Sequence, residues 1–209
     1  MIRFYYAPWS RASTILWLLE ELGQPYAIER VDIRAPGGVP ESYRAIQPNK
    51  KVPAIMHDGA VVTERAAICL YLTEKFPGAD LAPAIDDKDR AAFLSWLVYS
   101  DSVFDPAVAA KAHGLTYESN DYSFGTFDDM LGHLEKTLSE RPYIAGDKFT
   151  AADVQIGSGI HYTMNVLGAL PERPVFKTYL DRVTARPAFQ RSAAMDLAMA
   201  KDAGMAGAA

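Results

Sequence analysis

Strand-like segments are confined to the first third of the chain, and this distribution limits the possible fold more than any other feature. Apolar runs of strand length, bounded by turn residues, occupy Ile2–Tyr6 and residues 26–33, 50–57 and 60–62. A helical pattern between the first two runs ends at Gly23, and another covers residues 64–76. This alternation of strands and helices predicts a small α/β domain.

Beyond residue 86 the sequence shows helical patterns and no convincing strand. Apolar residues recur at helical spacing over residues 86–113, 123–139, 150–167, 174–185 and 187–199. Pro106 lies inside the first of these segments and is expected to kink or interrupt it. We therefore predict an α/β domain over residues 1–78, a linker over 79–86 and an all-helical domain over 87–209.

The third helix of this second domain carries a start signal in its sequence. Thr150 can cap the helix, and Asp153, three residues on, can bond back to the cap as in a capping box. The segment that follows is apolar on most sides, so we expect this helix at the centre of the helical domain.

Composition and charge exclude several classes of function. A hydrophobic share of 49% in 209 residues is that of a soluble globular protein, and the net charge of −5 argues against nucleic acid or an anionic membrane as main partner. No apolar run has the length of a membrane span, and the first residues lead into a strand rather than a signal peptide, so we expect a cytoplasmic protein. The single cysteine, Cys69, lies among apolar residues and is interpreted as a core thiol. The histidines show no ligand spacing, so no metal site is expected.

The turn between the first strand and the first helix is the first candidate site. It carries Ser10 and Ser13 close to the start of the helix, where unpaired backbone N–H groups and the helix dipole favour an anion. A thiolate is one anion that could be held there. The alternative is that either serine only caps the helix, because serine is a preferred capping residue.

A proline in a strand-like run marks a second candidate site. Pro53 stands between Val52 and a run that continues to a hairpin at Asp58 and Gly59. Proline is tolerated in strands only at an edge, a start or a special turn, and a cis peptide at Val52–Pro53 would account for its presence.

Four segments, taken together and in order, resemble the cytosolic glutathione transferase family. They are the serine–arginine turn with residues 16–23, the turn at residues 51–54, residues 63–68, and the capping segment at residues 146–153. The resemblance implies a thioredoxin-like domain followed by a helical bundle domain, in a homodimeric enzyme of detoxification. It also implies glutathione as co-substrate, with its thiolate attacking small hydrophobic electrophiles.

The resemblance also implies roles for individual residues. Ser10 is the expected catalytic hydroxyl, and Tyr5 and Ser13 are the alternatives. Glu64 matches the acid that meets the γ-glutamyl ammonium group of glutathione, whereas Arg65 replaces the hydroxyl residue that usually follows it. The remaining candidates for glutathione binding are Arg11, Lys50, Lys51 and the Val52–Pro53 backbone.

The pocket for the electrophile is expected between the domains, beside the first helical turn and the long helix that follows the linker. The candidate lining residues are Trp9, Tyr99, Val103, Phe104 and Lys111. Two other functions stay open: a glutathione-dependent disulfide or peroxide reductase, in which Cys69 is badly located to help, and a non-catalytic glutathione-binding or scaffold protein.

Overall fold

The computed structural model describes residues 1–205, and these form two compact units. The first unit combines Met1–Ala79 with the chain from Pro187 onward, and the second is Asp80–Arg186. The first boundary falls at the start of the expected linker, but the C-terminal end of the chain differs from the expectation. The helix from Pro187 belongs to the α/β unit, and the last four residues of the expected helical domain lie outside the described residues.

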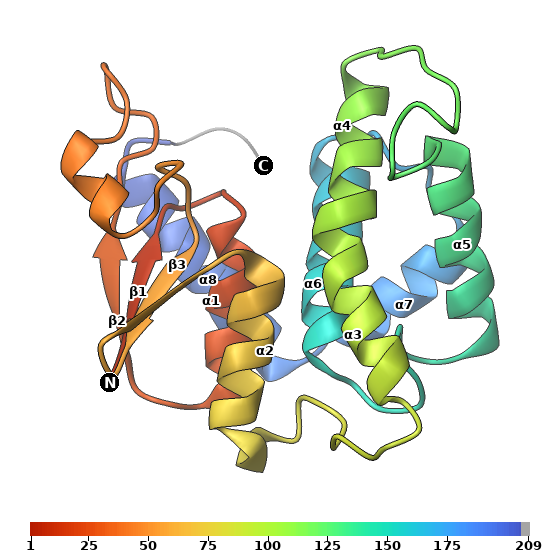
Figure 1. Cartoon of the computed structure of the whole chain (residues 1–209), viewed down its shortest axis with the longest axis horizontal. Coiled ribbons are helices and arrows are strands. Elements are labelled where there is room, and N and C mark those ends of the chain that lie inside the picture. Colours follow the sequence, from red (N-terminus) through yellow and green to blue (C-terminus); the bar gives the residue numbers. More distant parts are fainter. Residues whose placement is uncertain (206–209) are drawn as a thin grey trace. The chain divides into compact units, whose positions relative to one another are not determined.

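A four-stranded mixed sheet forms the centre of the first unit (Figure 1). Its strands lie in the order β2-β1-β3-β4, with β1 parallel to β2 and antiparallel to β3, and β3 antiparallel to β4. Their bounds are Ile2–Tyr6 for β1, Tyr26–Arg30 for β2, Ala54–His57 for β3 and Ala60–Thr63 for β4. The sheet and its helices confirm the predicted thioredoxin-like domain.

Three helices complete this unit. Within residues 1–205 they are α1 (Ala12–Leu22), α2 (Arg65–Lys75) and α8 (Pro187–Asp202), and a 3-10 turn lies at Glu41–Ala45. α1 is buried along most of its length because its apolar residues pack against β1, α2 and α8. It ends at Gly23, whose φ of 63° favours glycine.

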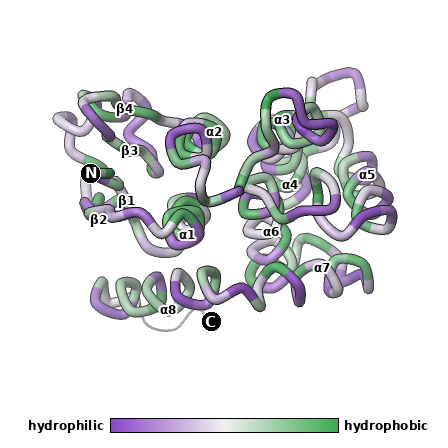
Figure 2. Tube along the Cα trace, turned by 90° about the horizontal axis from the view of Figure 1, so that it is seen from below, coloured by the Kyte–Doolittle hydropathy of each residue, from purple (hydrophilic) through white to green (hydrophobic). Residues whose placement is uncertain are grey.

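α8 lies alongside α1 (Figures 1 and 2). The rings of Trp17 and Phe189 meet edge to face with centroids 4.9 Å apart, and Arg191 Nε donates to Glu20 Oε2 over 2.8 Å. The contacts group this helix with the first unit, whereas the sequence analysis grouped it with the helical domain. An amphipathic pattern shows that a helix buries one face, but it does not show which domain receives that face.

The second unit is helical throughout its regular structure, which confirms the other half of the predicted fold. It contains α3 (Arg90–Tyr99), α4 (Asp105–Ala112), α5 (Phe127–Glu140), α6 (Ala151–His161) and α7 (Pro174–Thr184). A π-helical segment at Ser100–Phe104 joins α3 to α4. Pro106 follows it in the first turn of α4, where a missing N–H is tolerated, so the expected interruption of the long helix is confirmed.

α6 is the central helix of this unit, and nearly all of its residues are buried. Thr150 and Asp153 form the predicted capping box at its start. The Asp153 carboxylate also accepts hydrogen bonds from the backbone N–H of Ile144 over 2.7 Å and from the hydroxyl of Tyr179 over 2.9 Å. Complete burial raises the pKa of Asp153 to about 6, although these hydrogen bonds favour its ionised form.

Candidate functional site

A pocket of about 490 Å³ opens in the first unit, a size typical of small-molecule sites. Three segments line it: the turn before α1, the loop after β2, and the chain that leads into β3. Their lining residues are Trp9, Ser10, Arg11, Ile33, Gly38, Val39, Asn49, Lys50, Lys51 and Val52. The pocket therefore brings together the two candidate sites that the sequence indicates, the serine turn and the segment before Pro53.

The turn before α1 is held by residues distant in sequence. The Arg34 guanidinium donates to the carbonyl oxygens of Pro8 over 3.2 Å and of Trp9 over 3.0 Å. On α8, the Asp196 carboxylate accepts from the backbone N–H of Trp9 over 3.1 Å and from the hydroxyl of Tyr6. Trp9 itself has a φ of 49°, a conformation that bulky residues rarely adopt.

The Ser10 hydroxyl stands at the start of α1 in two hydrogen bonds. It donates to the carbonyl oxygen of Ala7 over 2.7 Å and accepts from the backbone N–H of Ala12 over 3.0 Å. The second bond satisfies the N–H of the first residue of α1, although the N-cap position itself is held by Arg11, without a side-chain capping bond. The first bond is not fixed, because a hydroxyl proton can rotate toward another acceptor while its oxygen stays in place.

The alternative hydroxyls do not line the pocket. Tyr5 is buried, and its ring packs against that of Tyr43 with centroids 5.7 Å apart. Ser13 Oγ is buried without a hydrogen bond of normal geometry, although it lies close enough to the Tyr6 phenol to oppose the rise in its pKa. Burial, followed by the hydrogen bond to Asp196, raises the pKa of Tyr6 far above its ordinary value, so this phenol stays protonated.

The lysines of the pocket have different roles. Lys50 Nζ donates to the carbonyl oxygen of Val39 over 2.9 Å and to Glu41 over 2.7 Å, so it holds the loop that forms one wall. Hydrogen bonds from Lys50 and Arg44 lower the pKa of Glu41 to about 2. The Lys51 ammonium group is exposed and contacts no acceptor within residues 1–205. Lys51 is therefore a cation that a ligand carboxylate can reach.

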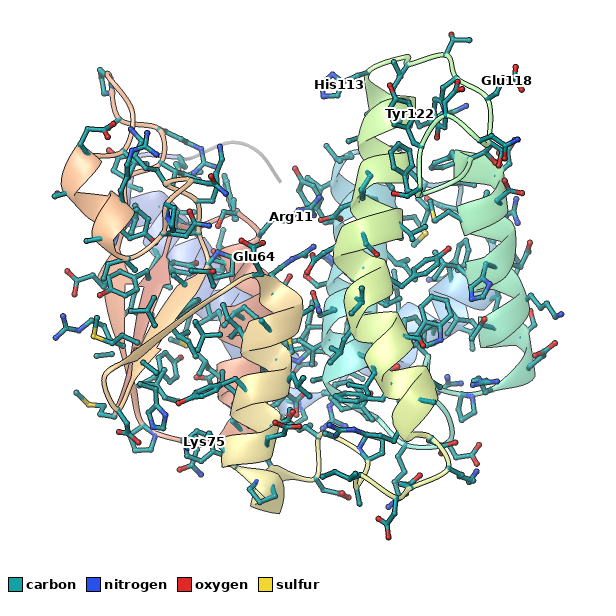
Figure 3. The ribbon with its side chains drawn as sticks, viewed as in Figure 1. Arg11, Glu64, Lys75, His113, Glu118 and Tyr122 are labelled. Carbon is teal, nitrogen blue, oxygen red and sulfur yellow. The ribbon has the colours of Figure 1, made fainter. Side chains whose placement is uncertain are left out.

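Glu64 lies next to the pocket rather than in its lining. It precedes α2 with a φ of 66°, and its carboxylate accepts from the Gln47 side chain over 3.4 Å. Gln47 in turn accepts from the backbone N–H of Asn49 over 2.6 Å, so it connects Glu64 to the lining. Figure 3 shows Arg11 and Glu64 at the same end of the first unit. Arg65, also outside the lining, is buried at the start of α2.

The peptide bond between Val52 and Pro53 is cis, which confirms that expectation from the sequence. Val52 lies in the pocket lining, and Pro53 immediately precedes β3.

The candidates for the electrophile pocket are found in different surroundings. Trp9 lines the pocket of the first unit, whereas Phe104 is fully buried in the second unit, against Gly159. The ammonium group of Lys111 lies over the ring of Phe127, 5.6 Å from its centroid. Val103 is half-buried in the π-helical segment.

Tyr99 lines a second pocket, of about 370 Å³, within the helical unit. Its ring stacks on that of His133 with centroids 5.4 Å apart, and Trp96 packs beside both rings. Burial raises the pKa of Tyr99 to about 12 and lowers that of His133.

Two family models match the chain. The glutathione S-transferase N-terminal domain covers residues 8–75, and the glutathione S-transferase C-terminal domain covers residues 107–191. The chain belongs to the glutathione S-transferase family.

Among curated relatives, this family member is 29% identical over 203 residues to the disulfide-bond oxidoreductase YfcG of Escherichia coli (strain K12), covering 90% of this chain and 92% of that protein. It is 28% identical over 192 residues to glutathione S-transferase F13 of Arabidopsis thaliana, covering 84% of this chain and 86% of that one.

Two solved structures of the family were determined with glutathione. The theta-class glutathione S-transferase of Xanthomonas axonopodis pv. citri is 26% identical with a TM-score of 0.76, over 91% of this chain and 96% of that one. A sphingomonad glutathione S-transferase is also 26% identical, with a TM-score of 0.74 over 93% of this chain and 98% of that one.

Within residues 1–205, no helix is long and apolar enough to cross a membrane. No group of three or more histidine, cysteine, aspartate or glutamate residues with a metal-binding arrangement occurs in the same part of the chain.

Some residues at the site were not predicted from the sequence. Arg34 and Asp196 hold the turn before α1, but they stand 25 or more positions from it in the chain. Neither residue belongs to a motif, so no local pattern indicates its role. Lys50, one of three candidates for the glycyl carboxylate, lines the pocket, and its ammonium group has two acceptors within the protein.

Proposed function

We propose that this chain binds glutathione in the 490 Å³ pocket and activates its thiol for attack on a small hydrophobic electrophile. One observation carries the proposal: a single pocket combines the Ser10 hydroxyl at the start of α1, the Lys51 ammonium group, which has no acceptor within residues 1–205, and the backbone of Val52. A thiolate, a carboxylate and an extended peptide backbone are the ligand groups that these three features suit.

Each part of glutathione has a proposed partner. The backbone of Val52, beside the cis bond to Pro53, would pair with the cysteinyl part as an added strand does. Lys51, with Arg11 near it in the lining, would meet the glycyl carboxylate. Glu64 would meet the α-ammonium group, and the backbone at the start of α2, where Arg65 stands, would meet the γ-glutamyl carboxylate.

The chemistry requires loss of one proton and formation of one bond. The glutathione thiol releases its proton to solvent, and the Ser10 hydroxyl donates a hydrogen bond to the resulting thiolate. The sulfur lone pair then forms a carbon–sulfur bond while the leaving group departs with its bonding electrons. The protein contributes deprotonation and position.

The proposed electrophile binds against Trp9 in the pocket of the first unit. Tyr99, Val103 and Lys111 stay predictions from the sequence. Phe104 is a weaker candidate for contact with the electrophile, because its ring is buried in the core of the second unit. A homodimeric, cytoplasmic enzyme remains part of the proposal, and size-exclusion chromatography with light scattering tests the dimer.

A second candidate function is glutathione-dependent disulfide reduction, which the name of the Escherichia coli relative favours. Cys69 is fully buried, so in this reaction the second sulfur would come from the substrate or a second glutathione rather than from the chain. A third candidate is glutathione binding without turnover, favoured by Arg65 in the position of the usual hydroxyl residue.

The three candidates are separated by one set of measurements on the purified protein. Calorimetric titration with glutathione measures binding, and turnover is then measured with an aromatic halide and with a mixed disulfide of glutathione. We expect binding and turnover of the halide. Turnover of the disulfide alone would favour the reductase, binding without either turnover would favour the binding protein, and absence of binding would refute all three.

A further inference from the structure

A carboxylate from the C-terminal helix reaches the turn that carries Ser10. Asp196 lies on α8, and its Oδ1 accepts from the backbone N–H of Trp9 over 3.1 Å and from the hydroxyl of Tyr6. Both donors share this one oxygen. The contact joins segments 187 and 190 positions apart in the chain, and all of them belong to the first unit.

The turn needs such an external contact because its backbone is strained. A bulky residue with a positive φ, such as Trp9 at 49°, costs free energy and persists only where the surroundings hold it in place. Arg34 holds the carbonyl oxygens of Pro8 and Trp9. Asp196 holds the N–H of Trp9, which is the donor that the arginine cannot bind.

Tyr6 keeps the carboxylate in position. Its side chain is fully buried at the end of β1, directly before the turn, and its hydroxyl donates to Asp196. Burial keeps this phenol protonated, because its pKa lies far above the ordinary value. The phenol therefore fixes Oδ1 beside the Trp9 N–H without taking part in proton transfer.

We propose that Asp196 is a positioning residue for the thiol-activating turn, acting from α8 through the backbone N–H of Trp9 to place the Ser10 hydroxyl in the pocket. The inference rests on the proposed function and extends it to a residue outside the pocket lining. α8 then has two roles in the first unit: it packs against α1, and it positions the turn that carries Ser10.

The chain offers a matched control on the same helix. Arg191 also ties α8 to the first unit, with its Nε 2.8 Å from Glu20 Oε2 and its Nη2 3.2 Å from the Glu20 carbonyl oxygen. This contact lies on α1, away from the turn. An effect caused by weaker docking of α8 would appear in Arg191→Ala as well as in Asp196→Ala, whereas an effect on the turn would appear only in the latter.

The experiment compares wild-type protein with Asp196→Ala, Asp196→Asn and Arg191→Ala by two readouts. The first is hydrogen exchange of the Trp9 amide in the protein without ligand, which reports the turn and needs no catalysis. The second is the pKa of the bound glutathione thiol from the ultraviolet absorbance of the thiolate, with kcat and KM measured on an aromatic halide. Asparagine keeps one oxygen that can accept from both donors, so it should rescue the alanine variant.

In Asp196→Ala we expect faster exchange of the Trp9 amide, a raised thiol pKa and a kcat about tenfold lower. In Asp196→Asn and Arg191→Ala all three quantities should stay close to their wild-type values. Unchanged Trp9 exchange in Asp196→Ala would overturn the proposal, and so would faster exchange with unchanged thiol pKa and kcat. Equal effects in Arg191→Ala would also overturn it, since docking of α8 would then be the cause. If the bound thiol in the wild-type protein keeps the pKa of free glutathione, the proposed function itself is refuted. Exchange of the Trp9 amide in the variants would still decide whether Asp196 holds the turn.

Discussion

Replacing Ser10 with alanine should raise the pKa of the bound glutathione thiol. In the structure the hydroxyl donates to the carbonyl oxygen of Ala7 over 2.7 Å, so it must leave this acceptor to reach a thiolate. The exchange replaces a neutral hydrogen bond, about 0.5–1.5 kcal/mol, by a charge-assisted one, about 1.5–3 kcal/mol. The net preference for the thiolate is then about 1–1.5 kcal/mol.

This free energy corresponds to a change in thiol pKa of about one unit. A free thiol has a pKa of about 8.5, so Ser10 alone would lower it to about 7.5, and the positive end of α1 would add a smaller share. The alanine variant should therefore show about a tenfold lower thiolate fraction at pH values well below the pKa, and kcat there should fall by a similar factor.

The assay is a pH titration of thiolate absorbance in protein saturated with glutathione. Ser10→Thr keeps the hydroxyl and should keep the lowered pKa, whereas Ser13→Ala removes a hydroxyl outside the pocket lining and should change nothing. Circular dichroism checks the fold, because Ser10→Ala also loses the contact with the Ala12 N–H, which is worth about 1 kcal/mol. A change in thiol pKa of less than about 0.3 units in Ser10→Ala would show that this serine only stabilises the start of the helix. If the thiol pKa changed in Ser13→Ala instead, Ser13 would be the activating hydroxyl.

Three further outcomes are expected. Lys51→Ala should raise the KM for glutathione about two- to fivefold with kcat unchanged, since an exposed ion pair contributes up to about 1 kcal/mol. Lys75→Ala, at the end of α2 away from Glu64 (Figure 3), should leave the KM unchanged. Equal effects of the two substitutions would exclude Lys51 as a ligand. Because burial raises the pKa of Asp153 from 3.8 to about 6, its contribution to stability is full below about pH 4 and should decline by up to about 3 kcal/mol as pH rises through 6. Urea unfolding from pH 4 to 7 should therefore show a flatter pH dependence in Asp153→Asn, and parallel curves would contradict this. Gly159→Ala places a methyl group 2.9 Å from a buried ring and should lower the free energy of unfolding by about 1–2 kcal/mol, whereas Gly132→Ala, with open space around it, should raise it by about 1 kcal/mol.

The local features of the fold could be predicted because they are written in short stretches of sequence. Thr150 and Asp153 indicate the start of α6, and Gly23 indicates the end of α1. Pro53 indicates the cis peptide bond that precedes it. Each depends on neighbours within a few positions. The serine turn and the segment at Val52 were also found separately, and the parallel and antiparallel pairing of β1 brings them to one pocket.

The features that could not be predicted depend on contacts between distant segments. Nothing in the residues around Asp196 indicates that its carboxylate meets Trp9, because that contact exists only after α8 has packed against α1. Lys50 and Lys51 are adjacent and of the same type, yet among the residues that the structure describes only Lys50 has acceptors for its ammonium group. The distinction is set by the loop at Val39, whose path no periodic pattern specifies.

The membership of α8 in the first unit has a consequence for the order in which the chain can fold during synthesis. The second unit is one continuous stretch, Asp80–Arg186, and all of it has left the ribosome before α8 appears. The sheet and α1 are made before this unit, but the partner that covers α1 and holds the turn at Trp9 is made after it. The sheet and α1 are therefore completed only after the whole second unit has emerged, and the emerging chain carries an uncovered apolar surface of α1 until α8 arrives.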